Sequence, residues 1–405
     1  MRGLWANDFI GKFGDELKRL IKVLLVLVLV AATAGVTFCV TYQELTAMYA
    51  PSPAEAKAEE IEAYLRTYFI DDYSDTALAD GAAAGMIAAT GDEWSYYISA
   101  ENYAQYLEQM NNAYVGVGVT IRANESAKGF EIMSVTEGGP ADAAGVLVGD
   151  ILVSVEGESV WDLGMDETVS RVRGEEGTEV TMSFLRDGSA LELTLVRSNI
   201  DKPVASSQMT EDGIAIITIE NFDRHCADET LAAIEEALEQ GAKGIVFDVR
   251  NNPGGLKDEM VRILDRLLPE GPLFRSVDYA DREETDVSDA AFVDLPMAVL
   301  VNGDSYSAAE FFAAAMQEYG AATIVGTQTY GKGNFQNTFL LSDGSAISIS
   351  VGKYFTPNGV SLTGVGITPD IEVELDEEQS AKLYYDQLPM DEDLQMAAAK
   401  NSAAE

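Results

Sequence analysis

The sequence predicts a protein of mixed α/β class with more than one domain, and three observations support this prediction. From Gly213 onward, apolar runs of strand length alternate with segments of helix-forming composition. Between residues 113 and 198, short stretches of strand-forming residues are separated by glycine-containing turns. The chain has 405 residues, of which 47% are hydrophobic, so it is long enough for two or three domains that each bury a core.

Residues 23–40 contain no charged side chain, and a basic cluster precedes them. This length suits a single transmembrane helix whose amino terminus lies in the cytoplasm. We therefore expect a cytoplasmic tail at 1–22, a transmembrane helix at 23–41, and the remaining chain outside the cell membrane. A cleaved signal peptide is the alternative, because Ala32-Thr33-Ala34 fits a small-x-small cleavage site. The protein would then be secreted.

The next part of the chain, residues 53–112, is expected to be a helical segment that follows a proline-marked linker. Its expected helical stretches are 55–68, 75–89, 92–97 and 102–110. The aromatic side chains of this segment are interpreted as ordinary core, without a role in chemistry.

Residues 113–198 are expected to form one unit of short strands. The unit opens with Val115, Gly116, Val117, Gly118 and Val119. The two glycines alone are compatible with a hairpin bulge. The whole unit, including Gly145, Gly149 and Arg173-Gly174, resembles a PDZ domain of the bacterial protease type. The resemblance implies that the opening run presents backbone amides to the carboxylate of a peptide while a strand edge pairs with it.

A serine lies at a turn between a strand and a helix in the later part of the chain. The apolar run 297–301 reads as a buried strand, and residues 308–319 have helix-forming composition. Ser305 and Ser307 lie between them. At such a turn a serine hydroxyl and the amides of the helix start can face the same point, as an acyl-transfer nucleophile and its oxyanion hole require.

A serine nucleophile needs a base, and the composition restricts the choice. The single histidine, His225, lies in a polar link and is interpreted as a surface or capping residue. The other choice is a lysine made neutral by burial, and Lys332 lies between Gly331 and Gly333. From glycine spacing alone, a solvated lysine in a turn is the favoured interpretation, and a functional lysine is the alternative.

Two glycines after a buried strand suggest a second part of an acyl-transfer site. Gly254 and Gly255 end the run Asp248-Val-Arg250-Asn-Asn-Pro-Gly-Gly. This run begins at the end of the expected buried strand at 244–249. The amides of the two glycines can form a nest that receives an anion, and a plain strand-to-helix turn is the alternative reading.

These motifs together resemble the carboxy-terminal processing proteases, also called tail-specific proteases, over residues 59–376. The residues that carry the resemblance are Val301, Asn302, Ser305, Ser307, Ala308, Glu310, the Gly331-Lys332-Gly333 turn, Gln336 and the Asp-x-Arg-x-Asn-Pro-Gly-Gly run. The resemblance implies that Ser307 is the nucleophile, Lys332 the general base and Gln336 the residue that orients the lysine. It also implies that Gly254 or Gly255 and the Ala308 amide hold the oxyanion. Tyr306 and Ala309 depart from the family pattern, but neither departure changes a reacting atom.

The resemblance implies a strand-strand-helix core of the crotonase and Clp-protease type at 199–376, with an inserted PDZ domain at 113–198. It implies a membrane-anchored, extracytoplasmic serine endopeptidase that recognises the carboxy termini of proteins. The PDZ domain is expected to gate the protease, with Arg173 as a regulatory contact. In that family the amino-terminal helical segment often serves dimerisation, so a homodimer is among the expected assemblies. Glu310 is expected to cap its helix, because an acidic side chain suits a helix start, and membership of the polar network of the site is the alternative.

The composition restricts partners and cofactors. The formal net charge is −42, which argues against nucleic acid as a partner and suits solubility or adaptation to salt. The only two cysteines, Cys39 and Cys226, lie far apart, so neither a disulfide framework nor a metal site is expected. No cofactor is expected. The acidic residues 377–405 are expected to form a partly disordered tail.

Two other classes of function stay open at this point. The chain can be a PDZ scaffold whose protease fold has lost its activity, although the presence of Ser307, Lys332 and Gln336 argues against this. It can also be a crotonase-like acyl-transfer enzyme, because that superfamily shares the repeating strand-strand-helix core. The PDZ unit and the membrane anchor disfavour the second alternative.

Overall fold

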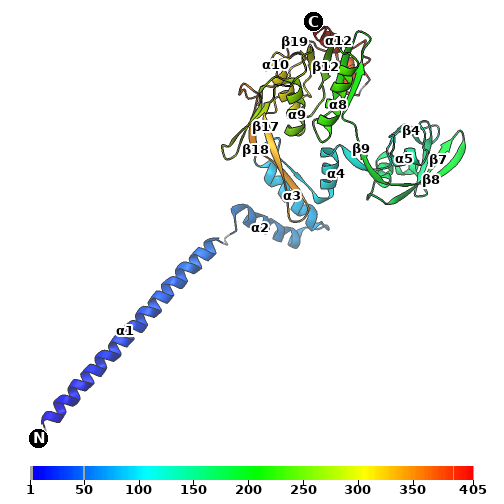
Figure 1. Cartoon of the computed structure of the whole chain (residues 1–405). Coiled ribbons are helices and arrows are strands. Elements are labelled where there is room, and N and C mark those ends of the chain that lie inside the picture. The colour runs from blue at the N-terminus through cyan, green and yellow to red at the C-terminus, as the bar shows by residue number, and fades with distance from the viewer. Residues whose placement is uncertain (1–2, 49–50, 386, 405) are drawn as a thin grey trace. The chain divides into compact units, whose positions relative to one another are not determined.

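The computed structural model describes residues 3–48, 51–385 and 387–404. The chain divides into two compact units, residues 1–82 and residues 83–405. The second unit contains both helices and four β-sheets, so the predicted mixed α/β class is confirmed (Figure 1).

The first unit contains α1 (Gly3–Met48) and α2 (Pro53–Tyr68), and α3 (Asp75–Ala88) continues into the second unit. Within α1, the part Lys18–Glu44 is long and apolar enough to cross a membrane, a test that a signal sequence also passes. Helix α2 begins at a capping box, in which the Glu55 amide donates to Ser52 Oγ at 3.1 Å and the Ser52 amide donates to Glu55 Oε2 at 3.2 Å.

The expectation of helix at residues 92–97 is wrong. Residues 92–95 form a turn in which the Ser95 hydroxyl donates to the Asp92 carboxylate. The following strand, β1 (Tyr96–Ile98), pairs antiparallel with β18 (Ala346–Phe355). The aromatic and β-branched residues of β1 favour a strand when a partner strand is present, and only the folded core supplies that partner. Helix returns at α4 (Ala100–Met110), which is capped by Ser99.

Residues 119–196 form a six-stranded antiparallel sheet with three short helices. The strands are β3 (Val119–Asn124), β4 (Gly129–Val135), β5 (Ile151–Val155), β6 (Glu158–Ser159), β7 (Glu179–Arg186) and β8 (Ser189–Val196). The helices are α5 (Pro140–Ala143), α6 (Val160–Leu163) and α7 (Met165–Val172). This unit has a core of its own, which includes Ile132, Leu152 and Phe184. The chain enters it through β2 (Ala113–Gly116) and leaves it through β9 (Ser198–Asp201), and these two strands pair with each other.

The largest core surrounds a second six-stranded sheet, in the order β10-β11-β12-β15-β16-β19. Its strands are β10 (Ala205–Met209), β11 (Ile214–Ile219), β12 (Gly244–Asp248), β15 (Met297–Val301), β16 (Ala322–Gly326) and β19 (Ile371–Glu372). Helices α8 (Cys226–Glu239), α9 (Lys257–Leu267) and α10 (Ala308–Glu318) contribute to the apolar cluster on one face. Every residue of β12 and β15 is buried, as expected for parallel strands that are covered on both faces.

A further sheet has the order β1-β18-β13-β14, with β17 also paired to β18. The strands not yet given are β13 (Gly271–Asp278), β14 (Glu283–Ser288) and β17 (Asn334–Leu340). This sheet matters for function because β17 follows the Gly331-Lys332-Gly333 turn directly, while β1 follows the turn at 92–95.

The expectation that the carboxy-terminal residues are partly disordered is not met by the residues that the structure describes. Helices α11 (Glu377–Tyr384) and α12 (Leu394–Ser402) are formed, and Met396, Ala399 and Ala403 pack against the second face of the β10-β11-β12-β15-β16-β19 sheet. The apolar side chains of α12 are buried against a sheet whose strands come from distant parts of the sequence. Composition alone does not show this, because the tail is acidic and rich in alanine.

A buried ion pair fixes this carboxy-terminal helix to the core. Arg250 is paired with Asp248 at 2.6 Å and with Asp393 at 2.8 Å, and 3% of its side chain is exposed. Its Nη1 also donates to Gln395 Oε1 at 3.0 Å. Asp393 in turn accepts the Met396 amide at the start of α12, at 3.0 Å.

We expect Asp393→Ala to lower the free energy of unfolding by about 2 to 4 kcal/mol, because it leaves a buried guanidinium with only part of its compensation. Chemical denaturation measures this change. The neighbouring Glu392→Ala is the matched control, since its side chain is 57% exposed and lies 4.0 Å from Lys382. Equal effects of the two variants would contradict the prediction.

Candidate active site

Ser307 lies between β15 and α10, where the sequence predicted a strand-to-helix turn. Its φ of 58° and ψ of −124° are unusual for a residue other than glycine, and such strain is typical of functional turns. Ser305, the other serine of the motif, is fully buried and its hydroxyl donates to the Val249 carbonyl at 2.7 Å. The Tyr306 amide donates to the Asn252 carbonyl at 3.1 Å. Ser305 therefore has a structural role, and the turn is tied to the 248–255 loop.

Glu310 joins the two loops that the sequence singled out. Its carboxylate is fully buried and accepts four hydrogen bonds. Oε2 accepts the amides of Ser307 at 2.9 Å and Lys332 at 2.8 Å, while Oε1 accepts the Gly331 amide at 2.7 Å and the Thr329 hydroxyl at 2.6 Å. Burial raises the pKa of Glu310, and its hydrogen bonds oppose this rise. The expected helix cap is present, but the bridge to the Lys332 loop was not predicted.

The glycines on both sides of Lys332 allow its loop to lie against another loop. A Cβ added to Gly331, whose φ is 98°, would lie 2.9 Å from the Val365 amide nitrogen. A Cβ added to Gly333 would lie 2.3 Å from Thr363 Oγ1. No other residue type fits at either place without displacing the loop at 363–366.

Lys332 itself is half-buried, and burial lowers the pKa of its ammonium, while Asp92 and Glu310 oppose this change. Its Nζ lies 4.3 Å from the centroid of the Trp94 ring and 5.8 Å from that of Tyr306. Only the neutral amine of a lysine can accept a proton from a serine, and a lowered pKa raises the fraction of the lysine in that form.

The glycines of the 248–255 loop lie directly beside the nucleophile. A Cβ added to Gly254 would be 2.8 Å from the Ser307 Cβ and 2.9 Å from the Ala308 nitrogen. The Gly254 amide already donates to Asn252 Oδ1 at 2.8 Å. Among the described residues, the amides of Gly255 and Ala308 have no acceptor. These two amides are therefore the donors left open to an oxyanion.

Gln336 is expected to orient Lys332, and no hydrogen bond between the two side chains is present among the described residues. Its Nε2 donates to the Asn334 carbonyl at 3.2 Å and to Ser350 Oγ at 3.1 Å. The Ser350 amide donates to Ser95 Oγ at 3.0 Å. The orienting role of Gln336 thus stays a prediction, and its contacts in the structure lead to the turn at 92–95.

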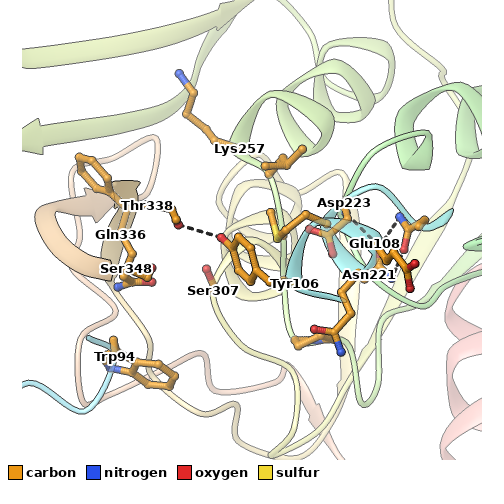
Figure 2. Close-up of a pocket in the computed structure, with 18 of the residues that line it drawn as sticks. Trp94, Tyr106, Glu108, Asn221, Asp223, Lys257, Ser307, Gln336, Thr338 and Ser348 are labelled. Atoms are coloured by element: carbon orange, nitrogen blue, oxygen red, sulfur yellow. Dashed lines mark hydrogen bonds between the residues drawn. The ribbon is translucent and has the colours of Figure 1, made fainter. Parts of the chain in front are cut away.

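Lys332 lines a cleft with a volume of about 950 Å³. Ser307 and Gln336 line the same cleft, together with Trp94 and Asp223 (Figure 2). Sequence reasoning missed the last two residues. For Trp94 there was no local signal, because the aromatic side chains around it have core-like composition. Asp223 lies beside His225, but only the fold brings it to the cleft.

Asp223 is chemically unusual. Its Oδ1 is buried and has no hydrogen-bond partner among the described residues. Burial, with a smaller contribution from Glu259, raises the pKa of Asp223 to about 7. His225 is exposed at the start of α8 and is not among the residues that line the cleft with Ser307, in agreement with its interpretation as a surface residue.

The expected peptide-binding run lies at the start of the antiparallel unit. Val115 and Gly116 belong to β2, and Val119 begins β3. Val117 is buried, and its carbonyl accepts the Ala141 amide at 2.9 Å. Gly118 has a φ of 76°, a conformation that glycine adopts readily.

Arg173, the expected regulatory contact, lines the same cleft as Ser307. Its Nη1 lies 3.2 Å from Glu108 Oε2 on α4, and its guanidinium lies 5.0 Å from the centroid of the Tyr114 ring. Arg173 therefore links the end of α7 to α4 and β2, and no contact between it and Lys332 is present among the described residues.

Comparison with known proteins assigns the chain to a family. Residues 213–373 match the description Peptidase family S41, and residues 131–186 match a PDZ domain. The chain is 32% identical over 339 residues to a probable CtpA-like serine protease of Staphylococcus epidermidis, covering 82% of this chain and 68% of that protein. The chain belongs to peptidase family S41. This S41 peptidase is a member of the carboxy-terminal processing serine proteases with a PDZ domain, as its sequence motifs suggested.

Two further similarities agree with this assignment. The S41 peptidase is 29% identical over 377 residues to the carboxy-terminal processing protease CtpA of Bacillus subtilis, covering 91% of this chain and 80% of that protein. A solved structure of a putative S41 protease from Bacteroides fragilis has a similar fold, with a TM-score of 0.50 and 18% identity over 83% of this chain and 92% of the other.

Proposed function

We propose that this S41 peptidase is an endopeptidase that cleaves proteins with a dyad of Ser307 and Lys332. The observation that carries the proposal is the shared carboxylate of Glu310, whose Oε2 accepts the amides of both residues at 2.9 and 2.8 Å. A single buried atom thereby holds the nucleophile turn and the lysine loop side by side. The strained conformation of Ser307 and the lowered pKa of Lys332 support the same roles.

In the proposed reaction, neutral Lys332 takes the proton from Ser307 Oγ as the oxygen attacks the scissile carbonyl carbon. The amides of Ala308 and Gly255 donate to the oxyanion of the tetrahedral intermediate. Lys332 then gives its proton to the leaving amine, and the acyl-enzyme forms at Ser307. A water molecule, deprotonated by the same lysine, releases the acyl group and restores the serine.

We further propose that α1 anchors the enzyme in a membrane with residues 83–405 outside the cytoplasm, and that the PDZ domain binds the carboxy termini of substrates. The basic residues before the apolar part of α1 support this orientation. The position of Arg173 in the cleft supports communication between the PDZ domain and the catalytic residues. The substrates proposed are extracytoplasmic proteins with apolar, partly unstructured carboxy termini.

The test of the dyad is labelling of the full-length protein, in detergent micelles, with a fluorophosphonate probe. We expect the label on Ser307, at a rate that rises with pH as Lys332 loses its proton, and a slower rate in Lys332→Ala. Mass spectrometry of the labelled peptide identifies the serine. Labelling at Ser305, or an unchanged rate in Lys332→Ala, would contradict the proposal.

A further inference from the structure

The ammonium of Lys332 lies against a cluster of three aromatic rings. Trp94, Tyr306 and Tyr330 contact one another, with centroid distances of 6.0 Å for Trp94 and Tyr306, 5.3 Å for Trp94 and Tyr330, and 5.7 Å for the two tyrosines. Within this cluster the Trp94 ring is nearest to Nζ, at 4.3 Å. This distance is well within the range of a cation–π contact, for which tryptophan is the strongest aromatic partner.

Trp94 is not held by its ring contacts alone. The turn that carries it is closed by the hydrogen bond from the Ser95 hydroxyl to Asp92. Ser95 Oγ also accepts the Ser350 amide of β18 at 3.0 Å, and Ser350 Oγ accepts Nε2 of Gln336 at 3.1 Å. The strand that follows the turn, β1, pairs with the same β18. The turn at 92–95 is thus fixed to the sheet that contains β17, the strand that directly follows the lysine loop.

We propose that Trp94 is a positioning residue for Lys332, holding Nζ by a cation–π contact in a defined place beside the nucleophile turn. The inference rests on the proposed dyad, because it assigns a partner to its base. It also gives Gln336 an indirect role: Gln336 supports the lysine through Ser350 and the turn at 92–95, in place of a direct hydrogen bond.

The contact has a predictable sign. The face of the indole ring attracts the ammonium but not the neutral amine, so Trp94 favours the charged form of Lys332 relative to an aliphatic side chain of similar size. Asp92 and Glu310 act in the same direction, and burial acts against all three. Within the cluster the phenols of Tyr306 and Tyr330 are also titratable, and the carboxylate of Asp304 interacts electrostatically with Tyr306. Removing the ring while keeping the site dry is therefore expected to lower the pKa of Lys332.

The experiment compares Trp94→Leu, which keeps apolar bulk, with Trp94→Phe, which keeps an aromatic face. Using the full chain and an unfolded protein substrate, kcat/KM is measured against pH. The acidic limb of this profile reports the deprotonation of the Lys332 ammonium in the free enzyme. We expect Trp94→Leu to lower the plateau roughly three- to thirty-fold and to move the acidic limb down by about half a unit to one unit. Trp94→Phe is expected to restore most of both properties.

Tyr279→Leu is the matched control. Tyr279 lies under another cation, with the Arg282 guanidinium 5.9 Å from its ring centroid, but 79% of this tyrosine is exposed and it is not among the residues that line the cleft. We expect its pH profile to match that of the unmodified enzyme. An unchanged profile in Trp94→Leu would overturn the inference, and so would an upward shift, which would show that the ring acts only by excluding water.

A second measurement separates this inference from the dyad itself. In a Ser307→Ala background, trace acetylation of Lys332 at a series of pH values, quantified by mass spectrometry, reports the pKa of the lysine without any cleavage. We expect Trp94→Leu to shift this titration downward in the same background. If the shift is present but Lys332→Ala retains cleavage, the dyad fails and the contact stands. If the shift is absent while Lys332→Ala loses cleavage, the dyad stands and the inference about Trp94 is overturned.

Discussion

Replacing Ser307 by alanine is expected to reduce cleavage of an unfolded protein with a free apolar carboxy terminus by roughly 10⁴-fold or more. The reason is that the other serine of this turn cannot take over the role of the nucleophile. Ser305, the nearest alternative in the sequence, is fully buried, and its hydroxyl donates a hydrogen bond to the Val249 carbonyl. Lys332→Ala is expected to lose roughly 10² to 10⁴-fold, as removal of a general base does.

Cleavage is measured by mass spectrometry of the products, with the full-length protein in detergent. The matched control is Lys353→Ala, which removes a lysine from β18, the strand that pairs with the strand following the Lys332 loop. Lys353 is not among the residues that line the cleft, so its replacement is expected to leave the rate within about two-fold. Cleavage that persists in both Ser307→Ala and Lys332→Ala would refute the dyad. If the unmodified enzyme is inactive alone, adding peptides with apolar carboxy termini tests whether the PDZ domain must be occupied first.

Glu310→Gln is expected to cause a loss of roughly 10² to 10³-fold in kcat with a smaller change in KM. The buried carboxylate accepts four hydrogen bonds, three of them from backbone amides: one from Ser307 in the nucleophile turn and two from Gly331 and Lys332 in the lysine loop. A carboxamide turns one acceptor oxygen into an NH₂ group, which faces donors and leaves at least one buried amide without a partner. Each such loss costs about 1 to 3 kcal/mol, and a shift of the two loops by even 1 Å separates nucleophile from base.

The same helix supplies a matched control for this variant. Glu318, at the other end of α10, also ties a loop by its carboxylate, accepting the Thr356 hydroxyl at 2.6 Å and the Asn358 amide at 2.8 Å. We expect Glu318→Gln to reduce thermal stability but to leave kcat per folded molecule unchanged. If the two variants lose kcat equally, Glu310 acts only on stability and its bridging role is wrong.

Several parts of the molecule were predictable from local sequence. The apolar run at 297–301, followed by Ser307 and an alanine-rich segment, leads to a strand, a turn and a helix wherever it is placed in a fold. The uncharged run at 23–40 similarly leads to a long apolar helix. These elements depend on side chains that are near one another in the sequence, so their periodicity and composition carry the information.

Other parts depended on contacts between residues that are far apart in the sequence. The acidic tail was expected to be partly disordered, yet α12 packs on the sheet because Asp393 reaches the buried Arg250. Trp94 was interpreted as core, and it reaches Lys332 only because β1 pairs with β18. Gln336 lines the cleft, but its hydrogen-bond partners are Ser350 on β18 and the carbonyl of Asn334 on its own strand, β17.

The sequence by itself determined the identity of the chemical groups in this protein, which are a serine at a strand-to-helix turn, a lysine between two glycines and glycine amides after a buried strand. Only the tertiary structure decided which neighbours tune them, namely the shared carboxylate of Glu310 and the ring of Trp94. The physical reason is that backbone conformation follows from local steric and hydrogen-bonding preferences. The position and pKa of a buried lysine depend instead on desolvation and on charges and rings brought from distant parts of the chain.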